Sequence, residues 1–189
     1  RVFGHFILLS TNGGTTLWMG NNPDSNGFYM PTPAFTEGLS EYARDKVLGE
    51  AAMRYIMAEP VAFLLRTIKK AALLHLGETI AVHWNAEGIK YRFGEGSLWP
   101  LKLITQSFWT GALALALTGL VIMILGSGVT VALTHPIVLT WIYFTAFYSV
   151  TLVQDRYHFP SHPLISILMA IALLTAIRHA RGGGEGDRP

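Results

Sequence analysis

The chain has 189 residues, of which 51% are hydrophobic and 14% are charged, well below the roughly 25% charged residues of a soluble domain. A net charge of only +2 and the lack of a basic run with interleaved aromatic residues argue against nucleic acid as a partner. The sequence contains no cysteine, which excludes disulfides, thiolate nucleophiles and cysteine-based zinc sites.

The N-terminal part of the chain is rich in turn-forming residues. Two apolar runs, at 2–10 and 15–19, flank Asn12-Gly13-Gly14. Because Asn and Gly adopt positive φ at little cost, this pattern predicts a short N-terminal β-hairpin. The stretch 20–27, Gly-Asn-Asn-Pro-Asp-Ser-Asn-Gly, follows and predicts an ordered loop.

Two helices are predicted next, near 40–59 and 60–77, because apolar residues recur there at helical spacing. The second is long enough to span a bilayer, but its three central basic residues each cost about 2.5–3.5 kcal/mol at the bilayer centre. We therefore expect an amphipathic helix in the membrane interface, with its basic side toward the headgroups. The stretch 81–101 is expected to be irregular.

The C-terminal part of the chain has the composition of a membrane domain. Residues 103–154 contain no Asp, Glu, Lys or Arg, and residues 159–177 again carry no charge. Since a bilayer core needs about 20 apolar residues per helix, region 103–178 predicts transmembrane helices near 104–125, 134–153 and 160–177. The glycine-rich tail, 179–189, is expected to be disordered and cytoplasmic.

The orientation follows from the distribution of basic residues. The end of the last span and the tail carry Arg178, His179, Arg181 and Arg188, whereas the 154–160 link carries one Arg. The positive-inside rule then predicts a cytoplasmic C-terminus and an extracytoplasmic domain over 1–100. No signal peptide precedes Arg1, so we interpret the chain as the C-terminal part of a longer polytopic protein. The predicted fold class is mainly α and integral to the membrane, with about three C-terminal transmembrane helices and an external α-rich domain.

Two clusters of basic residues are candidate phosphate sites. Arg156, helped by Tyr157 and His158, suits a lipid phosphate because the planar guanidinium donates two parallel hydrogen bonds. The alternative is an Asp155–Arg156 pair with ordinary interface anchoring. Lys69 and Lys70 are the second cluster, and their alternative role is attraction to anionic headgroups.

Four asparagines and two histidines are candidate ligands for a sugar and for a metal ion. The side chains of Asn12, Asn21, Asn22 and Asn26 could hydrogen-bond a sugar on which Trp18 or Tyr29 stacks, and turn formation is the alternative. The pair His158 and His162 has metal-ligand spacing, but Pro160 breaks the helix that this spacing requires. The sequence therefore predicts no metal site.

Several motifs, in order, carry a family resemblance: Ser10-Thr11-Asn12-Gly13-Gly14 through Gly20-Asn21-Asn22-Pro23, then Glu59-Pro60-Val61-Ala62-Phe63-Leu64 with Lys69-Lys70, and Asp155-Arg156-Tyr157-His158-Phe159-Pro160. Together they resemble the bacterial dolichyl-phosphate-mannose–protein mannosyltransferase-like glycosyltransferases, family 39 and relatives of the GT-C class. The resemblance covers nearly the whole chain.

The resemblance implies a multi-pass enzyme of the bacterial inner (plasma) membrane. Such enzymes move a sugar from a polyprenyl-phosphate-linked donor to a protein, lipid or glycan acceptor at the outer face of the bilayer. The family's catalytic acidic residue lies upstream, so no catalytic residue is expected in this chain. The loops with Asn12-Gly13-Gly14 and Asn21-Asn22 are expected to shape the external face of the active site.

The cofactor requirement is left open by the resemblance, which is compatible with a divalent metal held by upstream residues. Two other classes of function are alternatives. The first is a transporter or flippase segment in which Asp155 and Arg156 form a gate. The second is a non-enzymatic, membrane-anchored sugar-binding module.

Overall fold

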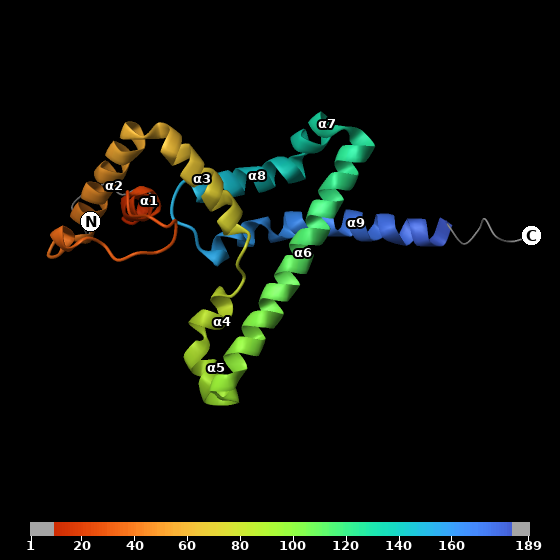
Figure 1. The fold of residues 1–189 in the computed structure, drawn as a ribbon, viewed down its shortest axis with the longest axis horizontal. Helices are drawn as coiled ribbons and strands as arrows, with labels where there is room; N and C mark the ends of the chain where they lie inside the picture. Colours follow the sequence, from red (N-terminus) through yellow and green to blue (C-terminus); the bar gives the residue numbers. More distant parts are fainter. Residues whose placement is uncertain (1–9, 183–189) are drawn as a thin grey trace, which may run out of the picture. The chain divides into compact units, whose positions relative to one another are not determined.

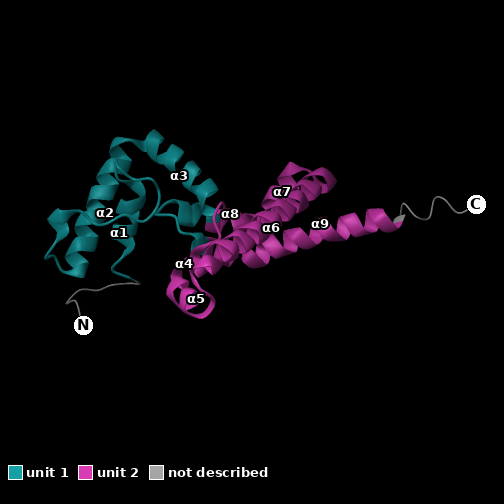
Figure 2. Ribbon diagram, turned by 60° about the horizontal axis from the view of Figure 1, so that its bottom comes forward, with its two compact units in different colours: residues 1–74, 145–157 teal, residues 75–144, 158–189 magenta. Residues whose placement is uncertain are grey.

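A computed structural model describes residues 10–182, which are mainly helical and contain no β-strand (Figure 1). The chain divides into two compact units (Figure 2). Unit 1 comprises residues 1–74 and 145–157, and unit 2 comprises residues 75–144 and 158–189. Each unit is therefore assembled from two separate segments of sequence.

Unit 1 is built on α1 (Gly13–Asn21), α2 (Glu41–Ala58) and α3 (Pro60–Leu74). Helix α2 begins where Ser40 accepts a hydrogen bond from the backbone N–H of Ala43, at 3.3 Å, and Pro60 opens α3, a position that tolerates its missing N–H. Helix α1 packs against α2. The core of the unit consists of Trp18, Met19, Leu48, Ala51, Ala52 and Leu152.

The predicted β-hairpin is not present. Residues 2–9 of its first strand lie outside the described part of the chain, and its second strand is helix α1. Asp45 on α2 accepts hydrogen bonds from the backbone N and from Oγ1 of Thr15, at 2.8 and 3.0 Å. Gly14 lies so close to α2 that a Cβ there would be 2.1 Å from the carbonyl oxygen of Asp45. The Asn-Gly-Gly sequence thus permits a close contact between helices rather than a hairpin turn.

Helix α3 is amphipathic, but of its three basic residues only Lys69 is exposed as predicted. Lys70 is only 2% exposed, and Arg66 is half-buried within unit 1. The apolar side of the helix is the exposed one, with relative exposures of 70% at Val61 and 62% at Leu65. A long, flexible basic side chain can reach backbone carbonyls inside the unit, and this leaves the apolar residues facing outward.

Unit 2 contains two long helices, α6 (Leu98–Ser127) and α9 (His162–Gly182), which pack against each other. Gly119 makes this packing possible, because a Cβ there would lie 2.0 Å from the carbonyl oxygen of Leu168. The stretch expected to be irregular contains α4 (Ile80–Trp84) and α5 (Ala86–Phe93), and α7 (Val129–Thr134) follows α6. The core residues are Trp109, Ala116, Val138, Trp141, Ile165 and Leu168.

Two stretches, Glu95–Ser127 and Asp155–Arg181, are long and apolar enough to span a membrane. Helix α8 (Pro136–Ser149) is apolar but has only 14 residues, a rise of about 21 Å against about 30 Å for a bilayer core. Helix α9 continues to Gly182, so the predicted disordered tail begins as helix. Residues 183–189 lie outside the described part.

The predicted span 134–153 differs from the structure at its C-terminal end, because Leu152 and Val153 are buried in unit 1. Leu152 and Val153 are 2% and 1% exposed. The backbone N–H of Val153 donates to the carbonyl of Gly27 at 2.7 Å. These apolar residues are therefore buried against protein rather than lipid.

Candidate functional site

Unit 1 contains a cavity of about 360 Å³, within the range of small-molecule sites. Its lining is mostly polar and includes two arginines, and none of the described residues that line it is acidic. The lining residues are Asn12, Thr15, Thr16, Met19, Tyr29, Thr32, Arg44, Leu152, Gln154, Arg156 and Tyr157. This composition favours an anionic ligand with hydroxyl groups.

Three segments of unit 1 supply the cavity wall. Asn12, Thr15 and Thr16 lie at the start of α1, where the helix dipole adds positive partial charge. Arg44 comes from the first turn of α2, and Arg156 from the 3₁₀-helix η3 (Asp155–Ser161). Both guanidinium groups and a helix N-terminus therefore contribute positive charge to one cavity.

An aromatic stack positions Arg156. Its guanidinium carbon lies 5.4 Å from the centroid of the Tyr157 ring, a distance typical of a cation–π contact. Tyr157 in turn stacks on Tyr148, with ring centroids 5.0 Å apart and an interplanar angle of 15°. Arg156 itself is exposed and lines the cavity.

The other predicted sugar ligands have structural partners. The side-chain amide of Asn21 donates to the carbonyls of Leu17 and Val150 at 2.8 and 2.7 Å. Asn22 is also buried and donates to the carbonyl of Trp18 at 2.9 Å. Gly13 opens α1, and Gly14 packs against α2. Of the predicted asparagine and glycine ligands, Asn12 is the one that lines the large cavity.

Lys70 is also committed to protein contacts. Its Nζ donates to the carbonyls of Gly20 and Thr151, both at 2.9 Å, and to Oδ1 of Asn21 at 3.0 Å. Burial, followed by the nearby charge of Arg66, lowers the pKa of Lys70 to about 8. The lysine therefore joins the C-terminal end of α1 to the segment after α8.

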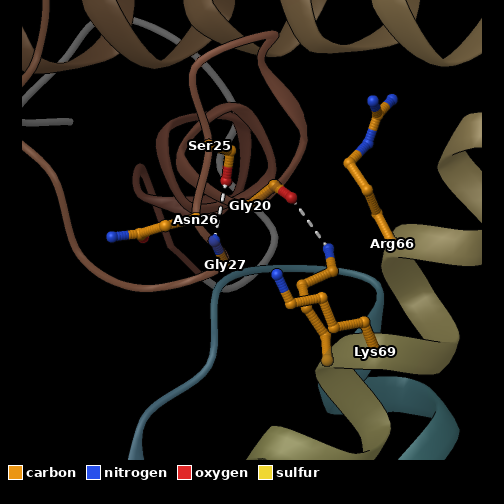
Figure 3. Close-up of a pocket in the computed structure, with 7 residues that line it drawn as sticks. Gly20, Ser25, Asn26, Gly27, Arg66 and Lys69 are labelled. Atoms are coloured by element: carbon orange, nitrogen blue, oxygen red, sulfur yellow. Dashed lines mark hydrogen bonds between the residues drawn. The ribbon is translucent and has the colours of Figure 1, made fainter.

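Lys69 lies beside Lys70 in a second, smaller cavity of unit 1. This cavity has a volume of about 40 Å³ and is lined by Gly20, Ser25, Asn26, Gly27, Arg66, Lys69 and Lys70. Figure 3 shows Lys69 directed from α3 toward the Ser25–Gly27 turn. This space is far smaller than the cavity that contains Arg156.

His158 has partners within unit 2. Its side chain is fully buried, and Nε2 lies 2.5 Å from Oε2 of Glu78. The imidazole stacks on Trp109, with centroids 4.2 Å apart and an interplanar angle of 11°. His162 is adjacent, its ring centroid 5.2 Å from that of His158. The two imidazoles are close together although Pro160 lies between the residues in the sequence. They do not share one helix, because His158 lies in η3 and His162 is the first residue of α9.

Sequence reasoning missed Arg44 and Glu78. Arg44 shares the polar side of its helix with other charged residues, and spacing alone does not distinguish it from them. Glu78 stands alone between apolar segments, 80 residues from its partner His158. The sequence signal that could have identified Glu78 is that it is an isolated acidic residue beside a membrane-like region.

No known protein family, curated protein or solved structure matches this chain. The function of the site is therefore argued from its residues and from the resemblance of its motifs.

Proposed function

We propose that this chain binds the sugar-phosphate part of a polyprenyl-phosphate-linked donor and forms part of a membrane glycosyltransferase. The enzyme transfers the sugar to a protein, lipid or glycan acceptor at the outer face of the bacterial inner membrane. The observation that carries the proposal is the polar cavity of about 360 Å³ in which Arg44 and Arg156 converge with Asn12 and Tyr29.

The two arginines supply the phosphate-binding half of this cavity. A guanidinium donates two parallel, charge-assisted hydrogen bonds to phosphate oxygens. The N-terminus of α1 adds a favourable dipole for the same charge. The Tyr157–Tyr148 stack restricts Arg156, which lowers the entropy lost when it binds a ligand.

Polar side chains supply the sugar-binding half. Asn12, Thr16 and Gln154 line the cavity and offer donors and acceptors for hydroxyl groups. Tyr29 also lines it and is 66% exposed, so its ring is open for stacking on a sugar face. This set of residues accounts for both parts of a sugar-phosphate ligand.

The chemistry assigned to this chain is stabilisation of the leaving group. As the acceptor hydroxyl attacks the anomeric carbon, the bond to the phosphate oxygen breaks and negative charge develops on the lipid phosphate. Fixed cations that face this oxygen lower the barrier, and Arg156 is the first candidate. The resemblance implies that the base is an acidic residue upstream, and we assign no base within this chain.

The bilayer is the second partner in this proposal. Two stretches long enough to span a membrane anchor the chain, and the exposed apolar side of α3 rests on the lipid. In this proposal unit 1 lies on the extracytoplasmic side and the C-terminus lies in the cytoplasm, and the basic residues at the end of α9 support that orientation.

Sugar transfer in membranes that contain the full-length protein tests the proposal. Wild type should transfer radiolabelled sugar from a polyprenyl-phosphate donor, and Arg156→Ala should reduce kcat/KM by about 100-fold, the effect of losing a charged contact worth about 2.7 kcal/mol. Arg54→Ala removes an exposed arginine of α2 that does not line the cavity, and it should leave the rate unchanged.

Other outcomes separate the alternatives. Equal transfer by wild type and Arg156→Ala would remove Arg156 from the site. Donor binding without transfer would indicate a sugar-binding module. Movement of the intact donor across the bilayer without transfer would indicate a flippase.

A further inference from the structure

Glu78, His158 and His162 of unit 2 form a cluster of metal-ligating side chains that the proposed function does not use. One ligand atom from each side chain lies within 4.8 Å of the other two. Two imidazole nitrogens and one carboxylate oxygen form a ligand set for Zn²⁺. We propose that these three side chains bind a zinc ion, with a fourth coordination position taken by water or by another ligand.

His162 provides independent support for the site. Its Nε2 is buried and has no hydrogen-bond partner among the described residues. A buried polar atom without a partner carries a free-energy cost, which makes it a feature to be explained. Coordination of a metal ion by Nε2 removes this cost. The residue is otherwise partly exposed, so an ion can reach the cluster.

The imidazole of His158 is held in place before any ion binds. Its side chain is fully buried. Trp109 stacks on the ring at 4.2 Å between centroids, and His75 stacks on it at 6.1 Å with an interplanar angle of 27°. A ligand that is already ordered loses little conformational entropy on coordination.

The segment that carries Glu78 is fixed to α6. The backbone N–H of Glu78 donates to Oε1 of Gln106 at 3.1 Å, and Nε2 of the same glutamine donates to the carbonyl of Leu76 at 2.8 Å. Trp109 Nε1 donates to the carbonyl of His75, also at 2.8 Å. Outer contacts of this kind orient metal ligands in proteins.

The separations in the cluster suit a small divalent ion. Zinc–ligand distances near 2.0 Å imply about 3.3 Å between ligand atoms in a tetrahedron. The observed separations run from the 2.5 Å hydrogen bond between His158 and Glu78 up to 4.8 Å. Metal binding replaces that hydrogen bond with a bond from each of the two side chains to the ion.

Zinc binding by the tag-free full-length protein in detergent tests the proposal. The protein is stripped with chelator, dialysed against ZnCl₂ and analysed for metal content, and Co²⁺ absorption then reports the coordination geometry. Wild type should bind one ion per chain at this site. Glu78→Gln and His162→Gln should each weaken binding by more than about 100-fold, beyond the 10–100-fold typical of losing an outer partner.

The matched control is His179→Gln, because His179 is exposed on the same helix as His162. It should bind zinc as wild type does. His162→Gln leaves the hydrogen bond between Glu78 and His158 intact, so it is the variant least expected to unfold. Absence of saturable zinc binding by wild type, or equal binding by wild type, Glu78→Gln and His162→Gln, would overturn the proposal. The assay needs no sugar donor, so failure of the proposed function would not affect it.

Discussion

At the scale of single residues, Lys70 shows how unit 1 uses a buried charge. Its Nζ donates to backbone carbonyls and to Asn21 from both segments of the unit. An aliphatic side chain of similar length fills the same space but leaves those acceptors without this donor. Each buried acceptor that loses its partner costs about 1–3 kcal/mol.

Lys70→Met should therefore lower the melting temperature of the full-length protein in detergent by several degrees. Lys69→Met is the matched control, because Lys69 is the exposed neighbour on the same helix. It should melt as wild type does. An equal loss in the two variants would mean that the contacts of Lys70 are not what stabilises the unit.

The lowered pKa of Lys70 predicts how this stability depends on pH. Burial lowers the pKa from 10.5 to about 8 in the folded state, so between these values the unfolded chain binds more protons than the folded one. Unfolding free energy then rises with pH across that window, at about 1.4 kcal/mol per unit of pKa difference. The stability gap between wild type and Lys70→Met should widen from pH 8 to 10.5. A gap that narrows over this range would show that the pKa is not lowered.

The candidate site was predictable in part at this scale. Asn12, Arg156 and Tyr157 were chosen from their motifs, and all three line the cavity of unit 1. Lys70 was assigned to phosphate, but periodicity shows only that it shares a helix face with Arg66. The face of α3 that packs against the rest of unit 1 depends on carbonyl acceptors 80 residues away in the sequence. The spacing of apolar residues within the helix carries no information on those acceptors.

At the scale of elements, the spacing of apolar residues and the local composition predicted the long helices better than the short segments. The helices near 40–59 and 60–77 correspond to α2 and α3, and α6 and α9 cover two predicted spans. The Asn-Gly-Gly stretch failed as a hairpin because the same residues suit a helix start, and the contact with Asp45 favours the helix. Apolar residues 150–153 resembled a span because hydropathy does not distinguish burial in protein from burial in lipid.

Gly119 gives a test of how α6 and α9 pack. Gly119→Ala should destabilise unit 2 by about 1–3 kcal/mol, the usual cost of overpacking, because its Cβ would lie 2.0 Å from the carbonyl oxygen of Leu168. Gly111→Ala, on the same helix, has no atom within 4 Å of the added Cβ. It should be neutral or slightly stabilising, since Ala favours helix. Thermal unfolding in detergent measures both, and similar behaviour of the two variants would contradict the close contact.

At the scale of the whole molecule, neither unit is a continuous piece of sequence. Unit 1 needs residues 145–157, which come after most of unit 2 in the chain. Those residues supply Leu152 to its core and carbonyl acceptors to Lys70. A division of the sequence at residue 100, as composition suggests, separates unit 1 from part of its own core.

This arrangement predicts the effect of truncation. A chain that ends at residue 144 should lose protection from amide hydrogen exchange in α1 and α2, because unit 1 lacks its second segment. A chain that ends at residue 157 retains all of unit 1 and is the matched control. Equal protection in both chains would show that residues 145–157 are dispensable for folding of the unit.

The contact between Lys70 and Val150 also sets an order of events during biosynthesis. The two residues are 80 positions apart, which a ribosome covers in about 4–16 s at 5–20 residues per second. Throughout that interval the nascent unit exposes core side chains that residues 145–157 later cover. The first segment of unit 1 is therefore synthesised well before the second segment that completes its core, and it must stay unaggregated until residues 145–157 arrive.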